Sequence, residues 1–134
     1  MPKTIESKYL GNFKSSTQSP HNSEPITAAG ATSFTPVDML VASYGSCLLG
    51  TVDYAAQRNN FETTDSRSEI NFEMSADKTK IGKMRVTLFF GKDYDDQQKA
   101  VIEQSAKYNC HVGNSLSNEI QREYTFVYNA GRNI

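Results

Sequence analysis

Residues 35–47 read TPVDMLVASYGSC, and this stretch decides the fold that the sequence predicts. It opens with a threonine N-cap, a proline at the first helical position and an acid, Asp38, three residues after the cap. From residue 39 to residue 52 nearly every side chain is apolar or small. Such a helix has to be covered on most faces, and a partner subunit is one way to cover it. We expect a long buried helix that begins at Pro36 and ends near residues 58–60.

Shorter periodic segments surround this helix. Alternating apolar and polar residues predict two paired strands at 66–74 and 83–90. The other expected elements are a strand hairpin within residues 3–13 that turns at Gly11 and Asn12, a loop-rich stretch at 14–34 with one strand near Ile26 and Thr27, a helix at 93–108 with acids at its start, a short helix at 114–120 and a strand at 123–128. This order predicts one α+β domain over residues 1–134, with an antiparallel sheet on a long central helix.

Composition and charge exclude several classes of protein. The formal net charge of −1 gives no basic field, so we expect no nucleic acid partner. No run approaches the roughly 18 apolar residues that span a bilayer, so we expect no membrane segment. The first residues lack the apolar core of a signal peptide, which makes the cytoplasm the expected location. Two cysteines and two histidines without metal-ligand spacing predict no metal site.

The two cysteines, Cys47 and Cys110, are the candidate catalytic residues. A lasting structural disulfide is not expected in a reducing compartment, so each cysteine is either a small buried hydrophobe or a working thiol. A thiolate attacks a peroxide oxygen to give a sulfenic acid, and a second thiol captures that acid as a disulfide. This cycle needs two thiols and no cofactor. If the fold brings the two cysteines together, the sequence predicts a redox enzyme.

Three segments of the chain resemble the OsmC/Ohr family. Residues 35–47 resemble the helix motif of this family, whose members carry a redox cysteine at the position of Cys47. Residues 109–116, which read NCHVGNSL, resemble the second cysteine motif around Cys110, and residues 8–13, KYLGNF, resemble the opening of one branch. The 62 residues between the two cysteines hold the predicted strand pair and helix, as they do in the family.

The resemblance implies a fold, an assembly and an activity. The implied fold is an OsmC-like α+β subunit with antiparallel sheets around a long buried central helix, in an intertwined homodimer with active sites at the subunit interface. The implied activity is a peroxiredoxin-like thiol peroxidase of the oxidative stress response, which acts on small organic hydroperoxides. The implied reductant is a dithiol or a lipoylated protein. By matching position, Cys47 would be the peroxidatic thiol and Cys110 the resolving thiol.

The chain departs from the family pattern at three places. Family peroxidases hold the thiolate with an arginine near the N-terminus, whereas this chain has no arginine before Arg58 and carries Lys14 at the matching place. A lysine supplies charge without the planar fork of a guanidinium. The glutamate that pairs with that arginine corresponds to Val37, and the nearby Asp38 is better explained as the capping acid. The proline that usually follows the second cysteine is replaced by His111, which could lower the pKa of that cysteine or simply lie at the surface.

These features leave two hypotheses and one weaker alternative. The leading hypothesis is a thiol peroxidase that reduces organic hydroperoxides through Cys47 and Cys110, with Lys14 as a further candidate catalytic residue. Tyr44, three residues before Cys47, could line an apolar pocket for the substrate. The second hypothesis is a non-enzymatic dimer of the same fold that binds a small apolar or electrophilic ligand or senses oxidation. The third is a structural interaction domain, in which peroxide forms no disulfide between the two cysteines.

Overall fold

The computed structural model describes residues 2–21, 24–29 and 34–131. Their elements, in chain order, are β1 (Glu6–Gly11), β2 (Lys14–Gln18), β3 (Ile26–Ala28), α1 (Pro36–Gln57), β4 (Ser66–Met74), β5 (Ile81–Phe90), α2 (Asp96–Tyr108), α3 (His111–Ser115) and β6 (Gln121–Val127). They fall into two compact units, Met1–Ala42 and Ser43–Ile134.

The first unit is an antiparallel sheet in the order β1-β2-β3. Asn12 and Phe13 link β1 to β2 with φ angles of 54° and 63°, as both central residues of a type I′ hairpin turn require. The predicted strand at Ile26 is confirmed as β3. The expectation that residues 14–18 form part of a loop is wrong, because this polar segment pairs with a strand on each side. Its sequence has no apolar alternation to indicate a strand.

The second unit contains a sheet in the order β4-β5-β6. The predicted strand pair is confirmed, since β4 runs antiparallel to β5 from the pair Ser66 and Phe90 onward. In contrast, β6 runs parallel to β5, so the expectation of a wholly antiparallel sheet is wrong. The reason is the connection between these two strands, which passes through α2 and α3 and is long enough to return the chain to the starting end of β5.

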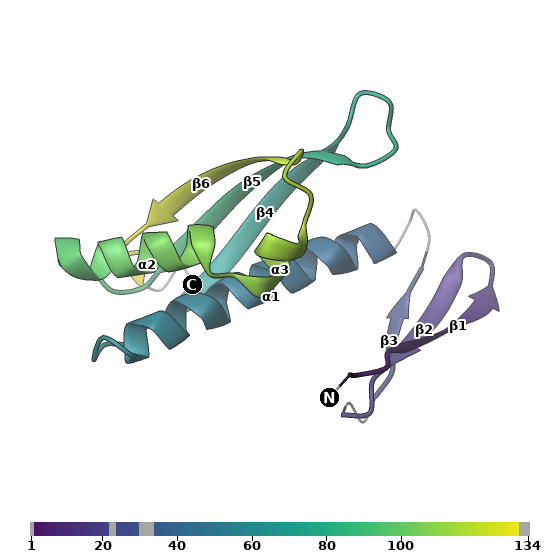
Figure 1. Ribbon diagram of the computed structural model, residues 1–134, viewed down its shortest axis with the longest axis horizontal. Helices are drawn as coiled ribbons and strands as arrows, with labels where there is room; N and C mark the ends of the chain where they lie inside the picture. Colours follow the sequence, from purple (N-terminus) through teal and green to yellow (C-terminus); the bar gives the residue numbers. More distant parts are fainter. Residues whose placement is uncertain (1, 22–23, 30–33, 132–134) are drawn as a thin grey trace. The chain divides into compact units, whose positions relative to one another are not determined.

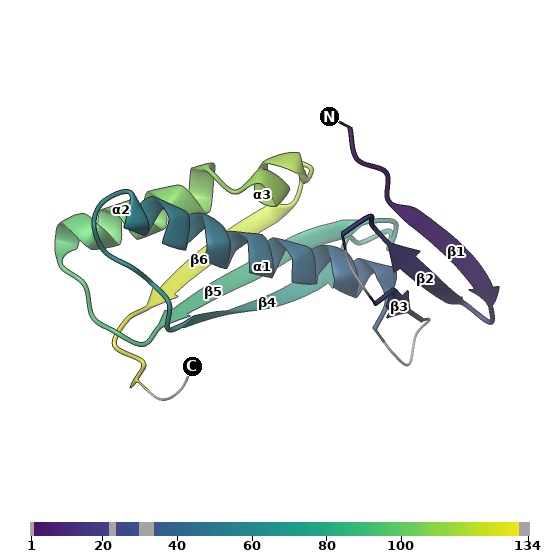
Figure 2. The ribbon, with the colours of Figure 1, turned by 90° about the horizontal axis from the view of Figure 1, so that it is seen from below.

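Helices α1 and α2 cover one face of this sheet (Figures 1 and 2). The fully buried side chains of α1 in this unit recur at every fourth residue, which places them on one face of the helix: Tyr44, Leu48, Val52 and Ala56. Gly45 allows the helix to approach β4 closely, because a Cβ atom at this position would lie 2.7 Å from the hydroxyl oxygen of Ser68. The opposite face of α1 is exposed in the single chain, so the helix is covered on one side rather than on most sides.

The two other helices begin at different residues from those predicted. Helix α2 starts at Asp96 instead of residue 93, because Asp95 and Gln98 form a reciprocal capping box. Helix α3 lies at His111–Ser115 instead of residues 114–120. Cys110 is its N-cap residue, and the sulfur accepts a hydrogen bond from the backbone N–H of Gly113 at 3.4 Å. A cysteine is not among the usual capping residues, which explains why the sequence pattern did not indicate this start.

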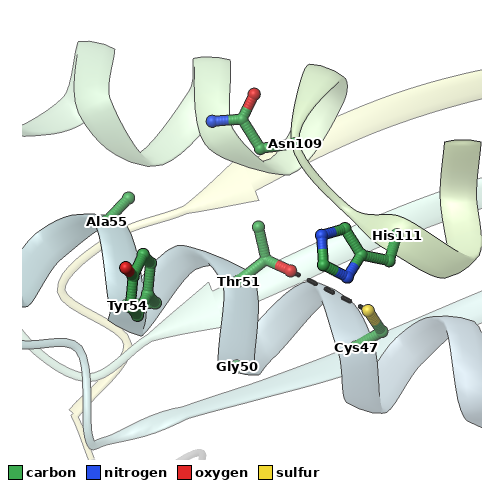
Figure 3. Close-up of a pocket in the computed structure, with 7 residues that line it drawn as sticks. All are labelled: Cys47, Gly50, Thr51, Tyr54, Ala55, Asn109 and His111. Atoms are coloured by element: carbon green, nitrogen blue, oxygen red, sulfur yellow. Dashed lines mark hydrogen bonds between the residues drawn. The ribbon is translucent and has the colours of Figure 1, made fainter. Parts of the chain in front are cut away.

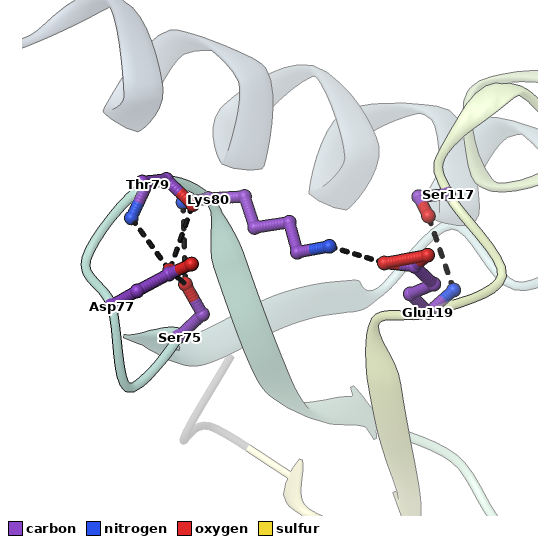
Figure 4. Close-up of polar contacts among 6 residues, drawn as sticks. All are labelled: Ser75, Asp77, Thr79, Lys80, Ser117 and Glu119. Atoms are coloured by element: carbon purple, nitrogen blue, oxygen red, sulfur yellow. Dashed lines mark hydrogen bonds and ion pairs between the residues drawn. The ribbon is translucent and has the colours of Figure 1, made fainter.

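A network of polar contacts connects the turn between β4 and β5 to the segment before β6 (Figure 4). In the turn, Asp77 accepts hydrogen bonds from the hydroxyl groups of Ser75 and Thr79. The next residue, Lys80, forms an ion pair with Glu119. Both side chains of this pair are exposed, so we expect the ion pair to define the path of the chain after α3 more than to stabilise the fold.

Four aromatic rings form a cluster at the end of the sheet away from that turn. Phe90 stacks on Tyr128 with ring centroids 5.4 Å apart and meets Tyr94 edge-on at 6.2 Å. Phe61 also packs on Tyr94, with ring centroids 5.6 Å apart. Because Phe90 is 0 % exposed, it lies at the centre of this cluster and joins β5 to the chain segments around it.

Candidate active site

The structure brings the two cysteines together from distant parts of the chain. Cys47 lies on α1 and Cys110 precedes α3, and both are free thiols. The Cys110 side chain is within hydrogen-bonding reach of the Cys47 sulfur. The two differ in access, because Cys47 is partly exposed whereas Cys110 is only 2 % exposed.

Neutral hydrogen-bond donors surround the sulfur of Cys47. The Thr51 hydroxyl lies one turn further along α1, with its oxygen 3.8 Å from the sulfur. Burial acts to raise the pKa of Cys47, but hydrogen bonds that favour the thiolate outweigh it and lower this pKa below its ordinary value. Those bonds come, in order of size, from the Val112 backbone, the Cys110 side chain, the Thr51 side chain and the His111 backbone.

The environment of Cys110 has the opposite effect. Burial raises the pKa of this thiol, and the nearby Cys47 raises it further, although the N–H of Gly113 acts in the other direction. One accessible thiol is therefore made more acidic, and one buried thiol beside it is made less acidic. Since the thiolate is the reactive form, Cys47 is the group of the pair that is suited to attack a substrate first.

The pH dependence of alkylation tests this difference. The thiolate fraction of Cys47 rises as pH increases through its pKa, so we expect the rate of modification by iodoacetamide to reach its midpoint below the value of about 8.5 for a free cysteine. Thr51→Val removes one donor and should move that midpoint upward. Mass spectrometry of the labelled peptides would separate Cys47 from Cys110. A Cys47 midpoint at or above that of a free thiol would contradict the assignment.

Cys47 opens into a pocket of about 600 Å³ between α1 and the segment that leads from α2 to α3 (Figure 3). The pocket is lined by Cys47, Gly50, Thr51, Tyr54, Ala55, Asn109 and His111. Small residues and the Tyr54 ring give one wall an apolar character, whereas Asn109 and His111 place polar groups at the other side. Such a pocket suits a small molecule with an apolar body and one polar end.

Tyr44 does not line this pocket, contrary to the sequence-based expectation. It is 0 % exposed, and its hydroxyl is hydrogen bonded to that of Tyr124 at 2.8 Å. Burial raises the pKa of Tyr44 well above its usual range, so the side chain remains a neutral phenol. A turn of α1 separates Tyr44 from Cys47, but the tyrosine points to the sheet instead of the cavity.

Arg122 is a residue near the site that sequence reasoning missed. Its guanidinium lies 5.5 Å from the centre of the Tyr44 ring and donates to the carbonyl oxygens of Leu116 and Ser117, each at 3.4 Å. These bonds fix the segment that follows α3 and thereby support the position of Cys110. The alternation along β6 could have indicated Arg122, because this residue lies on the same inward face of the strand as the aromatic Tyr124.

Gly113 allows α3 to lie close to this support. A Cβ atom at this position would be 2.8 Å from a ring carbon of Tyr44 and 3.5 Å from the Cβ atom of Cys110. Any larger residue would push the short helix away from the buried tyrosine. The close approach holds the cap residue, and with it the second thiol, against α1.

The remaining predicted site residues lie in the first unit. Lys14 is an exposed residue of β2, and its part in the reaction stays a prediction. Asp38 is confirmed as a capping acid, since its carboxylate accepts from the N–H of Thr35 at 2.9 Å while the Thr35 hydroxyl accepts from the N–H of Asp38 at 3.0 Å. Val37 follows the first residue of α1 and offers no acid. Of the predicted catalytic residues, the structure thus brings Cys47 and Cys110 together.

Two kinds of feature are absent from the described part of the chain. Within residues 2–21, 24–29 and 34–131, no three His, Cys, Asp or Glu side chains gather into a group that could hold a metal ion. No helix among the same residues has both the length and the apolar character that are needed to cross a membrane.

A comparison with protein families identifies the chain. The family model described as OsmC-like protein matches residues 29–125, which is well over half of the sequence. The chain belongs to the OsmC-like protein family. The matched range contains both cysteines, so the resemblance stated from the two motifs is confirmed.

Solved structures agree with this family and confirm the α+β fold class. A proposed osmotic stress induced and detoxification response protein of Psychrobacter arcticus has a TM-score of 0.83 at 20 % identity, with 92 % of this chain and 94 % of that chain covered. An OsmC-like protein of Mycoplasma pneumoniae has a TM-score of 0.77 at 16 % identity, with coverages of 96 % and 99 %. The organic hydroperoxide resistance protein OhrB of Bacillus subtilis has a TM-score of 0.68 at 14 % identity, with coverages of 94 % and 98 %.

Among curated sequences, an uncharacterised protein of Haloferax volcanii is 28 % identical to this OsmC-like protein over 108 residues. The alignment covers 78 % of this chain and 80 % of the relative. At these identities the comparisons define the family and the fold, and the chemistry has to be argued from the residues of this chain.

Proposed function

We propose that this OsmC-like protein is a thiol peroxidase that reduces organic hydroperoxides through Cys47 and Cys110. The observation that carries the proposal is the pair of neighbouring free thiols of unequal acidity, of which the more acidic one opens into a partly apolar pocket. Relatives of the same fold are named organic hydroperoxide resistance proteins, which supports a peroxide of organic type as the substrate.

The proposed reaction has two steps in the protein. The thiolate of Cys47 attacks the terminal peroxide oxygen, the O–O bond breaks, and the alkoxide leaves and takes up a proton to become an alcohol. Cys47 then carries a sulfenic acid. The sulfur of Cys110 attacks that of Cys47, a disulfide forms, and the displaced hydroxide takes the Cys110 proton to leave as water. An external dithiol, either a small molecule or a lipoylated protein, then reduces the disulfide by thiol exchange.

Neutral donors would perform the part that the arginine–glutamate pair performs in family peroxidases. Backbone N–H groups at His111 and Val112 and the Thr51 hydroxyl all stabilise a negative charge on Cys47. They are fixed by α3 and α1, so they need no rearrangement when the thiolate forms. The absence of a charged partner among these donors also favours the second candidate function, a sensor that is oxidised once and turns over slowly.

We also propose that the functional unit is an intertwined homodimer. In the single chain, large apolar side chains in or beside the N-terminal strands are about half exposed or more: Ile5, Tyr9, Leu10, Phe13 and Ile26. A monomer rarely leaves so many neighbouring apolar groups in water, and a second copy of the chain would cover them. Light scattering should give twice the chain mass of 14.9 kDa, and a monomeric mass would overturn this assembly.

Peroxide titration tests the proposed function directly. One equivalent of cumene hydroperoxide should remove two free thiols per chain and produce a disulfide between Cys47 and Cys110, which peptide mass spectrometry would identify. With excess dithiothreitol or dihydrolipoamide, peroxide consumption should continue over many turnovers. Formation of the disulfide without continued turnover would favour the sensor. A protein that consumes no peroxide and keeps both thiols would overturn both functions.

A further inference from the structure

The imidazole of His111 lines the pocket into which Cys47 opens. The proposed two-step reaction assigns no role to this side chain. The residue begins α3, its backbone N–H favours the Cys47 thiolate, and its side chain lines the same pocket. In Figure 3 the ring stands beside the Thr51 hydroxyl and the Cys47 sulfur, and all three groups line the same pocket. The ring and the nucleophile therefore face the same substrate.

Cleavage of an alkyl hydroperoxide creates a demand for a proton at this place. An alkoxide is a strong base and a poor leaving group, so a donor that protonates it as the O–O bond breaks lowers the barrier. We propose that His111 is the general acid that donates this proton. The proposal rests on the peroxidase function proposed above, and it assigns a role to a residue that stands where the family usually has proline.

The other groups around the pocket are less suited to this role. The amide of Asn109 has no proton that it can transfer near neutral pH, and the Thr51 hydroxyl already interacts with the Cys47 sulfur. Tyr54 is a phenol, which gives up its proton much less readily than an imidazolium does. A histidine is the side chain that exchanges a proton most easily between pH 5 and pH 8.

The protons of this step balance through exchange with water. Cys47 releases its proton to water as the neutral donors stabilise its thiolate, and the imidazole of His111 takes up a proton from water to become an imidazolium. The thiolate then forms a bond to the terminal peroxide oxygen, the O–O bond breaks, and the imidazolium proton passes to the departing alkoxide. The products are the sulfenic acid on Cys47, an alcohol and a neutral imidazole, so this step needs no further reactant.

A comparison of two peroxides tests the role of His111. Cumene hydroperoxide releases an alkoxide that needs a proton, whereas peracetic acid releases acetate, which leaves without one. We expect His111→Gln to lower the second-order rate constant for cumene hydroperoxide by roughly 10²-fold, within the range of general acid catalysis. The rate constant for peracetic acid should remain close to that of the wild type. Stopped-flow measurement of the first oxidation step, with no reductant present, gives both constants.

Two controls separate this role from a structural effect. His21→Gln makes the same change at the other histidine, an exposed residue of the first unit, and should alter neither rate constant. In His111→Gln the backbone N–H to Cys47 is kept, so the alkylation midpoint of Cys47 should not move. Equal losses with both peroxides, or no loss with either, would overturn the role of His111 and leave the peroxidase standing. A wild-type protein that reacts with neither peroxide would instead overturn the proposed function.

Discussion

Cys47→Ser is expected to abolish peroxide consumption, whereas Cys110→Ser, treated with one equivalent of peroxide and no reductant, should still consume it. The reason is the difference between the two sulfurs. The accessible Cys47 has the lowered pKa and meets the pocket, while Cys110 is buried and becomes useful only after Cys47 is oxidised. A colorimetric assay of residual peroxide, without added dithiol, would compare both variants with the wild type.

The chemical state of Cys47 provides the second measurement. In Cys110→Ser no thiol is available inside the chain to capture the sulfenic acid, so dimedone should trap it at Cys47, and excess peroxide should drive it to the sulfinic acid. Thr17→Ser, on β2 of the first unit, is a mild control that should behave as the wild type does. If Cys47→Ser retained turnover, or if dimedone labelled Cys110 in Cys47→Ser, the proposed order of the two thiols would be reversed or wrong.

Phe90→Ala should lower the free energy of unfolding more than the other substitutions named above. The ring is fully buried, stacks on Tyr128 and meets Tyr94 edge-on, so its removal leaves a cavity beside these two rings. Replacement of a buried phenylalanine by alanine typically lowers the free energy of unfolding by about 3–5 kcal/mol. Urea denaturation followed by circular dichroism would measure this loss at a fixed protein concentration, because a dimer gains apparent stability with concentration.

The adjacent residue offers a matched control. Phe89 points to the other face of the sheet, is only half-buried, and carries the guanidinium of Arg67 over its ring at 3.9 Å. Phe89→Ala should therefore cost about 1–2 kcal/mol, from partial burial and the lost cation–π contact. Equal losses for the two variants would show that the aromatic cluster is not the centre of stability that its geometry indicates.

Elements with a strong local pattern could be predicted from the sequence. The capping acid Asp38 and the apolar run after Pro36 predicted α1, and strict alternation predicted β4 with the bounds that the structure has. The polar strand β2 was missed because its side chains carry no apolar period, and only its two neighbours define it. The parallel direction of β6 depends on the path of α2 and α3, which no local pattern encodes.

The candidate site likewise contains residues that the sequence predicts and residues that only the fold reveals. Cys47 and Cys110 were identified because each lies in a recognisable motif, and their proximity followed from the family resemblance. The donors around Cys47 were not predicted, because a threonine one turn along a helix and a backbone N–H acquire their function only when α3 docks on α1. Arg122 was missed for a related reason, since it acts on carbonyl groups that the fold, and not the sequence order, brings within reach.

The sulfur of Cys110 has two roles, because it caps α3 and also completes the proposed redox cycle. In the reduced protein it accepts the hydrogen bond from the Gly113 N–H at 3.4 Å. Formation of a bond to the Cys47 sulfur is expected to move this sulfur and so to weaken its hydrogen bond with Gly113. The Gly113 amide should therefore exchange its hydrogen at different rates in the reduced and the oxidised protein. Hydrogen exchange at this single position would follow the redox cycle without any added label.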